Sequence, residues 1–217
     1  SDDQAFSKSL SWAIRNVLLI AVPATFALTL LSEPLLITLF QYGAFGANDT
    51  VMAAASLRAY SLGLGAFMLI KVLAPGFYAR EDMKTPVRIG VIAMVANMIL
   101  NLVLVSLLMW WSDLGHVGLA LATSLSAWLN AILLYSGLRR EQVIYSNSVP
   151  LSWLLRIAVA TSLMIVALWW AIPDIAIWSD WSLGLRVVNI LALCGGGLLV
   201  FILTLLLMGF RLRHLYR

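Results

Sequence analysis

Residues 185–210 read LRVVNILALCGGGLLVFILTLLLMGF, and this run contains a single charged side chain, Arg186. An α-helix rises about 1.5 Å per residue and the hydrocarbon core of a bilayer is about 30 Å thick, so about 20 apolar residues cross it. A strand of a membrane barrel needs only about ten residues with strict alternation, whereas this run is longer and continuously apolar. The stretch therefore predicts a transmembrane helix.

Five other segments share this length and apolar character. They cover about residues 12–31, 51–77, 87–111, 117–138 and 151–172. Pro23 interrupts the first of them, and residues 35–40, which follow Glu33-Pro34, are too few to cross a bilayer. We therefore expect an all-α, polytopic membrane protein with six transmembrane helices, and a short segment at residues 35–40 that lies on the membrane surface.

The composition of the chain supports this interpretation. Hydrophobic residues make up 62% of the 217 residues and charged residues 11%, against about 25% charged in a soluble domain. These values exclude an ordinary water-soluble domain, a disordered chain and a collagen-like repeat. Because the chain opens on Ser1-Asp2-Asp3, without an initiator methionine or a signal-peptide pattern, we interpret it as a fragment of a longer protein.

The placement of the cations predicts how the spans are oriented. One side of the predicted membrane carries Lys8, Arg15, Arg80, Lys84, Arg88, Arg139, Arg140, Arg156, Arg211, Arg213 and Arg217. Arg58 and Arg186 fall near the opposite ends of their spans, where we expect them to reach lipid phosphates. By the positive-inside rule both chain ends are cytoplasmic. The outer ends carry tryptophans expected to be interfacial anchors, namely Trp110, Trp111, Trp169, Trp170, Trp178 and Trp181.

No pattern in the sequence indicates an enzyme or a metal site. His116 and His214 belong to different predicted compartments, so they cannot share a metal ion or a proton. Cys194 is the single cysteine, and Glu81-Asp82 is a loop doublet that we expect to be solvated. We therefore predict no enzymatic activity, no metal or organic cofactor and no nucleic-acid partner.

A few polar groups lie inside the predicted spans. Lys71 either reaches the inner head groups with its stem in lipid or contacts a polar cavity. Asn97 and Asn101 are spaced i and i+4, so their amides share one helix face. The next span offers a stripe of small and polar residues, Gly118, Ala122, Ser126 and Asn130, with Thr123 beside them. These groups predict either close helix packing with interhelical hydrogen bonds or a cation site of amide and hydroxyl oxygens.

Two stretches resemble a known family of transporters. Residues 71–87 read KVLAPGFYAREDMKTPV, and residues 39–45 read LFQYGAF. Both are similar to the MurJ lipid II flippases, in the superfamily that includes multidrug and polysaccharide-lipid exporters. The resemblance implies that the chain is the C-terminal part of a fourteen-helix protein of this superfamily. Residues 1–140 would hold family helices nine to twelve, and residues 141–217 the additional pair, helices thirteen and fourteen.

The resemblance also implies a function. Such a carrier moves the undecaprenyl-diphosphate-linked peptidoglycan precursor across the bacterial inner membrane by alternating access, with lipid II and membrane lipids as partners. The final helix pair lines a groove thought to hold the lipid tail, and the main cavity arginines lie on the eight missing N-terminal helices. Candidate cavity or gating residues in this chain are Lys71, Pro75, Gly76, Tyr78, Asp82, Lys84 and Pro86.

The sequence leaves two possibilities for the driving force of transport and two alternatives to the flippase function. A sodium site found in some family members would correspond to Asn97, Asn101 and Thr123. At the position where those members carry a carboxylate, this chain has Asn101. Because that substitution removes the strongest ligand for the ion, coupling to the membrane potential is the other possibility. The alternatives to a lipid II flippase are a drug or polysaccharide-lipid exporter of the same superfamily, and a non-transporting membrane scaffold of cell-wall synthesis.

Overall fold

The computed structural model describes residues 2–112, 114–144 and 149–210, and these residues are helical without any strand. The helices are α1 Asp2–Phe40, α2 Ala47–Ser61, α3 Leu64–Tyr78, α4 Lys84–Ser112, α5 Gly115–Arg140, α6 Leu151–Ala171, α7 Ile175–Asp180 and α8 Leu183–Leu207. Six helical segments are long and apolar enough to cross a membrane when α2 and α3 are taken together. The predicted all-α fold with six spans is confirmed.

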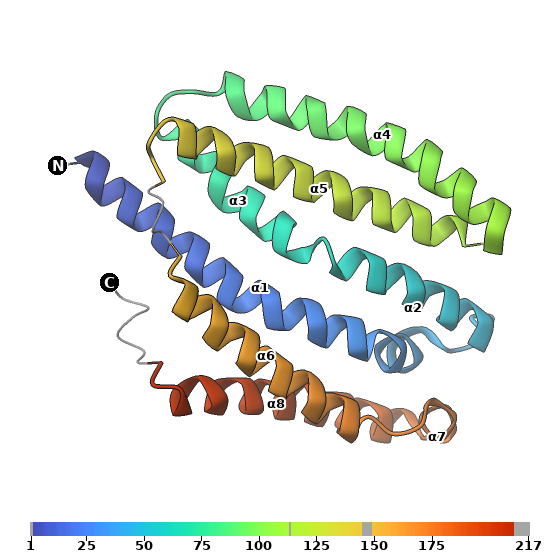
Figure 1. Ribbon diagram of the computed structural model, residues 1–217. Helices are drawn as coiled ribbons and strands as arrows, with labels where there is room; N and C mark the ends of the chain where they lie inside the picture. The colour runs from blue at the N-terminus through green and yellow to red at the C-terminus, as the bar shows by residue number, and fades with distance from the viewer. Residues whose placement is uncertain (1, 113, 145–148, 211–217) are drawn as a thin grey trace.

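The long helices lie side by side in the order α4, α5, the pair α2 and α3, α1, and then α6 with α8 (Figure 1). The N-terminus, the α3–α4 connection and the α5–α6 connection lie at one end of this bundle, which we call the basic end. The α1–α2 connection, the α4–α5 connection and α7 lie at the other end, which we call the far end. The cationic connections are therefore gathered at one end, and Arg211, Arg213, Arg217 and His214 lie outside the described residues.

The expectation of a separate surface segment at residues 35–40 was wrong. Helix α1 runs through Pro23 and Pro34 to Phe40, and Ile37 is buried in the cluster that contains Trp178. The Thr38 hydroxyl donates to the Pro34 carbonyl at 2.6 Å, within the last turns of this continuous helix.

The second span is not one uninterrupted helix, because α2 and α3 are separated at Leu62 and Gly63. Two side chains of α5 bond carbonyls at this break. The Ser124 hydroxyl donates to the Ala59 carbonyl at 2.7 Å, and the Trp128 indole donates to the Leu62 carbonyl at 2.8 Å. Non-helical backbone at membrane depth is stable only where such partners exist. Gly63 is required there, because an added Cβ would lie 2.7 Å from the Ser124 hydroxyl oxygen.

Candidate functional site

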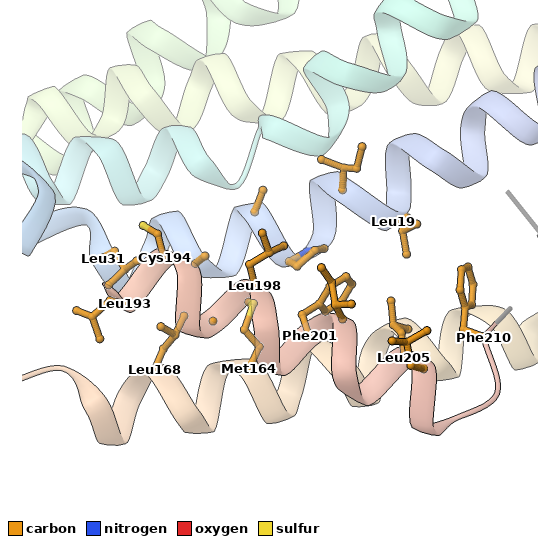
Figure 2. A pocket seen from close by; sticks show the side chains of 17 residues that line it. Leu19, Leu31, Met164, Leu168, Leu193, Cys194, Leu198, Phe201, Leu205 and Phe210 are labelled. Carbon is orange, nitrogen blue, oxygen red and sulfur yellow. The ribbon is translucent and has the colours of Figure 1, made fainter. Parts of the chain in front are cut away.

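An apolar groove lies between α1, α6 and α8 (Figure 2). Its volume is about 450 Å³. Its walls are formed by aliphatic, aromatic and sulfur-containing side chains together with small residues, among them Leu19, Pro23, Ala24, Ala27, Leu31, Met164, Leu168, Leu193, Phe201, Leu205 and Phe210. Such a surface offers nothing that recognises a polar ligand, and it suits a hydrocarbon chain.

The three glycines of α8 play different parts beside this groove. A Cβ on Gly197 would approach the Leu168 side chain to 3.1 Å, so this glycine lets α8 pack closely on α6. Gly195 and Gly196 would meet no atom within 4 Å, and both are exposed. Of these three glycines, Gly197 is therefore the one that allows the close approach of α8 to α6.

The far end of the α1–α8 contact is held by Arg186, which the sequence analysis took for an anchor to lipid phosphates. Arg186 is only 9% exposed and donates to the Ile37 carbonyl at 3.3 Å and to the Ser179 carbonyl at 2.5 Å. Its guanidinium also lies 5.9 Å from the centre of the Tyr42 ring. The expectation was wrong because the last carbonyls of α1 and α7 carry the partial negative charge of helix C-termini and attract the cation inward.

Two other presumed anchors of the far end also bond to the protein. Trp178 is fully buried, and its indole donates to the Thr38 hydroxyl at 3.1 Å, so it is not at an interface. Arg58 donates to the Ser32 hydroxyl at 2.8 Å and forms an ion pair with Glu33 at 3.0 Å. By contrast Trp110, Trp169 and Trp170 are highly exposed, as an interfacial anchor requires.

The candidate residues of α3 separate into an exposed set and a packed one. Lys71, Pro75 and Tyr78 are exposed and share one face of the helix. Gly76 is buried instead, and a Cβ there would lie 3.2 Å from the Leu138 side chain. The Pro75-Gly76 pair lies in the last turn of α3, which ends at Tyr78.

The remaining loop candidates build the start of α4. One carboxylate oxygen of Asp82 accepts hydrogen bonds from the backbone N–H groups of Lys84 and Thr85, each at 3.0 Å. Hydrogen bonding to the Thr85 side chain and then to its backbone lowers the pKa of Asp82, which keeps the carboxylate charged at the positive end of the helix dipole. Pro86 is buried in the first turn, where a missing N–H does no harm.

The polar residues of α4 and α5 form a chain of hydrogen bonds. Asn101 donates its amide to the Asn97 carbonyl oxygen at 3.0 Å, and Asn97 donates to the Ser126 hydroxyl at 3.1 Å. The Ser126 hydroxyl donates to the Thr123 carbonyl at 2.9 Å, whereas the Thr123 hydroxyl donates to Leu119 in its own helix. The structure thus brings Asn97 and Asn101 together and joins them to Ser126.

The two amide oxygens of this network differ in their bonding. The Asn97 oxygen that a cation would need already accepts a hydrogen bond from Asn101. The Asn101 amide oxygen is buried without a hydrogen-bond partner among the described residues. No group of three or more histidine, cysteine, aspartate or glutamate side chains that could hold a metal ion occurs in the described part of the chain.

The contacts at the break between α2 and α3 were not predicted from the sequence. The signal was present in Ser124 and Trp128, which are spaced i and i+4 on α5 and so project from one face. What the pattern could not tell is that this face meets the carbonyls of Ala59 and Leu62, because that depends on how the helices pack.

Comparisons with known proteins agree on one family. The family model described as "Lipid II flippase MurJ" matches residues 1–192. A relative from Vibrio cholerae, named "Probable lipid II flippase MurJ", is 43% identical over 210 residues, which is 97% of this chain and 39% of the relative. A relative of the same name from Haemophilus influenzae is 40% identical over 97% of this chain and 40% of the relative. The "Lipid II flippase MurJ" of Burkholderia cenocepacia is 36% identical over 86% of this chain and 34% of the relative. The chain therefore spans about two fifths of the length of these relatives.

Proposed function

Because the chain belongs to the MurJ family of lipid II flippases, we propose that it forms part of a carrier that moves a lipid-linked peptidoglycan precursor across the bacterial inner membrane. Six apolar helices long enough to span a membrane support a multi-pass membrane protein. A flippase moves its substrate without making or breaking covalent bonds, so we propose a transport function and no enzymatic one. The family match favours this function over a drug exporter or a non-transporting scaffold.

The single observation that carries the proposal beyond the family match is the groove between α1, α6 and α8. Its volume of about 450 Å³ is enclosed by apolar side chains from three helices. A carrier for a lipid-linked sugar must accept a hydrocarbon chain while the polar part crosses the bilayer. We propose that this groove holds part of that chain.

We further propose how the chain fits into the whole carrier. Residues 1–140 would provide helices nine to twelve, and residues 141–217 helices thirteen and fourteen. Eight N-terminal helices would supply the partner lobe, and the two lobes would rock around a central cavity to give alternating access. The share of each relative that the chain covers, 39% and 40%, is close to six helices out of fourteen.

The orientation in the membrane is part of the same proposal. The basic end carries Lys8, Arg80, Arg139 and Arg140, among other cations, whereas Arg58 and Arg186 at the far end are engaged by protein groups. By the positive-inside rule the basic end faces the cytoplasm, and both chain ends are then cytoplasmic.

For the driving force we propose coupling to the membrane potential rather than to sodium. A sodium ion at Asn97 and Asn101 would displace the hydrogen bond between these two amides and would gain no carboxylate ligand in return. Sodium-independent transport by the assembled carrier is the expected result.

Complementation tests the proposed function. The chain is produced together with the eight N-terminal helices of the Vibrio cholerae relative in a bacterium depleted of its own flippase, and growth is expected to be rescued. Ala24 lines the groove, so Ala24→Phe is expected to reduce rescue by at least tenfold in plating efficiency. Val188→Phe adds a ring to an exposed position of α8 outside the groove and serves as the matched control.

The outcomes separate the candidate functions. Failure of rescue despite correct membrane insertion of both parts would contradict the flippase proposal. Rescue that is equally strong with Ala24→Phe and Val188→Phe would support the family function but remove the groove from it. A scaffold would rescue growth without restoring transport of the lipid-linked precursor to the outer leaflet.

A further inference from the structure

A second and smaller pocket adjoins the groove at the basic end. Its volume is about 250 Å³, and its lining includes Arg15 of α1 together with Ser152, Trp153 and Arg156 of α6. Phe210 lines both this pocket and the groove, so the two cavities are neighbours. Figure 2 shows Phe210 at the end of the row of groove side chains, beyond Leu205. An apolar channel thus ends beside two guanidinium groups.

The helical spacing explains why the arginines lie in line with the groove. Arg15 precedes the groove residue Leu19 by four positions on α1. Arg156 precedes the groove residue Met164 by eight positions on α6, with Ala160 between them. Residues four apart share a helix face, so both cations continue the groove walls toward the basic end.

Arg15 and Arg156 have no carboxylate partner in the salt bridges of the described residues. The salt bridges found among the described residues join Arg58 to Glu33 and Arg80 to Glu141, and neither involves the pocket. Arg15 uses its Nε to donate to the Ser11 carbonyl at 3.4 Å, which leaves the outer nitrogens of its guanidinium for other partners. Both arginines are partly buried in a chain that lies largely in lipid, and a cation in such a place calls for an anionic partner.

The start of α6 adds to the positive field. This helix of 21 residues begins at Leu151 after Pro150, and Pro150, Ser152 and Trp153 all line the pocket. The N–H groups of a first helical turn carry a partial positive charge and bind phosphate groups. Guanidinium groups bind phosphate oxygens through paired hydrogen bonds, so two arginines and a helix start suit a multiply charged phosphate.

We infer that the pocket of Arg15 and Arg156 binds the diphosphate group of a polyprenyl lipid whose chain lies in the groove. The polyprenyl nature of the lipid tail rests on the proposed function, whereas the assignment of the diphosphate head group rests on the pocket. Two guanidiniums match a diphosphate better than the single charge of a phosphodiester, and one groove accommodates one chain rather than two. The site would hold the lipid at the leaflet of the basic end before its polar group crosses.

Native mass spectrometry of the chain, purified from nanodiscs of phosphatidylcholine, tests this inference. The probes are farnesyl diphosphate, which has an isoprenoid tail and a diphosphate head group, and farnesol, which has the isoprenoid tail and no diphosphate. We expect farnesyl diphosphate to bind the more tightly. The double variant Arg15→Gln/Arg156→Gln is expected to lose about a hundredfold in affinity for farnesyl diphosphate, since hydrogen bonds to charged groups are each worth about a factor of ten or more. Its affinity for farnesol should not change.

The control removes the same charge from the same end. Arg139→Gln/Arg140→Gln changes two exposed cations at the end of α5 that do not line the pocket, and it should leave both affinities unchanged. Circular dichroism and size-exclusion chromatography check that each variant is folded. If the double glutamine variant is not folded, Arg15→Lys/Arg156→Lys replaces it, because lysine keeps the charge. This variant should still bind farnesyl diphosphate more tightly than farnesol, by a smaller factor than the unchanged protein.

Three results would overturn the inference. Equal losses in the pocket pair and the control pair would indicate unspecific attraction by charge. Equal binding of farnesol and farnesyl diphosphate would remove the head-group site while the groove remained. Displacement of farnesyl diphosphate by an equal concentration of phosphatidylglycerol would assign the pocket to membrane phospholipid. Loss of farnesol binding in Ala24→Phe reports on the groove alone, so failure of the proposed function can be told from failure of the pocket.

Discussion

The helix pairs α4–α5 and α6–α8 are both built from apolar spans, but their interfaces differ. At the α4–α5 interface the backbones come close at Gly118, where a Cβ would lie 2.9 Å from the Leu104 carbonyl group, and Asn97 bonds Ser126 across the contact. At the α6–α8 interface larger side chains such as Leu168 and Phe201 meet, and a groove opens toward α1. Small residues let two membrane helices approach closely and polar side chains bond across them, whereas the larger side chains of α6 and α8 border an open groove.

The largest expected effect concerns the attachment of the groove pair to α1. Arg186→Met keeps the length of the side chain but removes the charged donors to the Ile37 and Ser179 carbonyls. We expect the free energy of unfolding in detergent to fall by about 3 kcal/mol, because hydrogen bonds from a charged group are worth about 1.5–3 kcal/mol each. Arg139→Met, at an exposed position of the basic end, should change it by less than about 0.5 kcal/mol. Equal effects in the two variants would mean that Arg186 does not hold this contact.

The second prediction sets the two interfaces against each other directly. Gly118→Ala places a methyl group against the backbone of α4, and we expect a loss of about 2 kcal/mol of stability from overpacking. Gly196→Ala meets open space on α8 and should be neutral or stabilising by up to about 1 kcal/mol, since alanine favours helix. Unfolding titrations of both variants give the two values. A loss at Gly196 as large as at Gly118 would contradict the contrast between a closed and an open pair.

The smallest effect concerns the polar contact of α4 with α5. Asn97→Leu removes the interhelical hydrogen bond to Ser126 together with the bond accepted from Asn101 in the same helix, and we expect the interhelical bond to account for about 1 kcal/mol of the loss, as for other interhelical hydrogen bonds in membranes. Asn189→Leu is the matched control, because the Asn189 amide bonds the Leu185 carbonyl within its own helix. The difference in unfolding free energy between the variants measures the interhelical bond. A difference of zero would show that small residues alone close this interface.

The candidate site was only partly accessible from sequence. The i and i+4 spacing of Asn97 and Asn101 correctly indicates that their amides share a face, and the structure joins them by a hydrogen bond. Spacing could not tell that Ser126 would complete the chain, since that requires the register between two helices. Arg15 and Arg156 entered the sequence analysis only as cations of one side, because their common pocket joins positions 141 residues apart.

The far end shows why buried charge is difficult to predict from sequence. Arg186 and Trp178 are residue types typical of interfacial anchors, and their positions along the chain fit that role. Burial of Arg186 depends on the carbonyl ends of α1 and α7 meeting at one point, and burial of Trp178 depends on the Thr38 hydroxyl. None of these partners is adjacent in sequence to the side chain that it satisfies: Ser179 precedes Arg186 by seven residues, and Ile37 and Thr38 lie far earlier in the chain.

The amino-acid sequence alone determined the class of the protein, the number of its spans and the gathering of its cations in alternate connections. These properties follow from local hydropathy, because each stretch of about 20 residues must itself be apolar enough to cross the hydrocarbon core. Only the tertiary structure decided that α1 continues through Pro34, that the second span breaks at Gly63 and that a groove runs beside two arginines. Each of these depends on partners from distant segments, since a backbone or charged group inside a membrane is stable only where another helix brings it a hydrogen bond or an opposite charge.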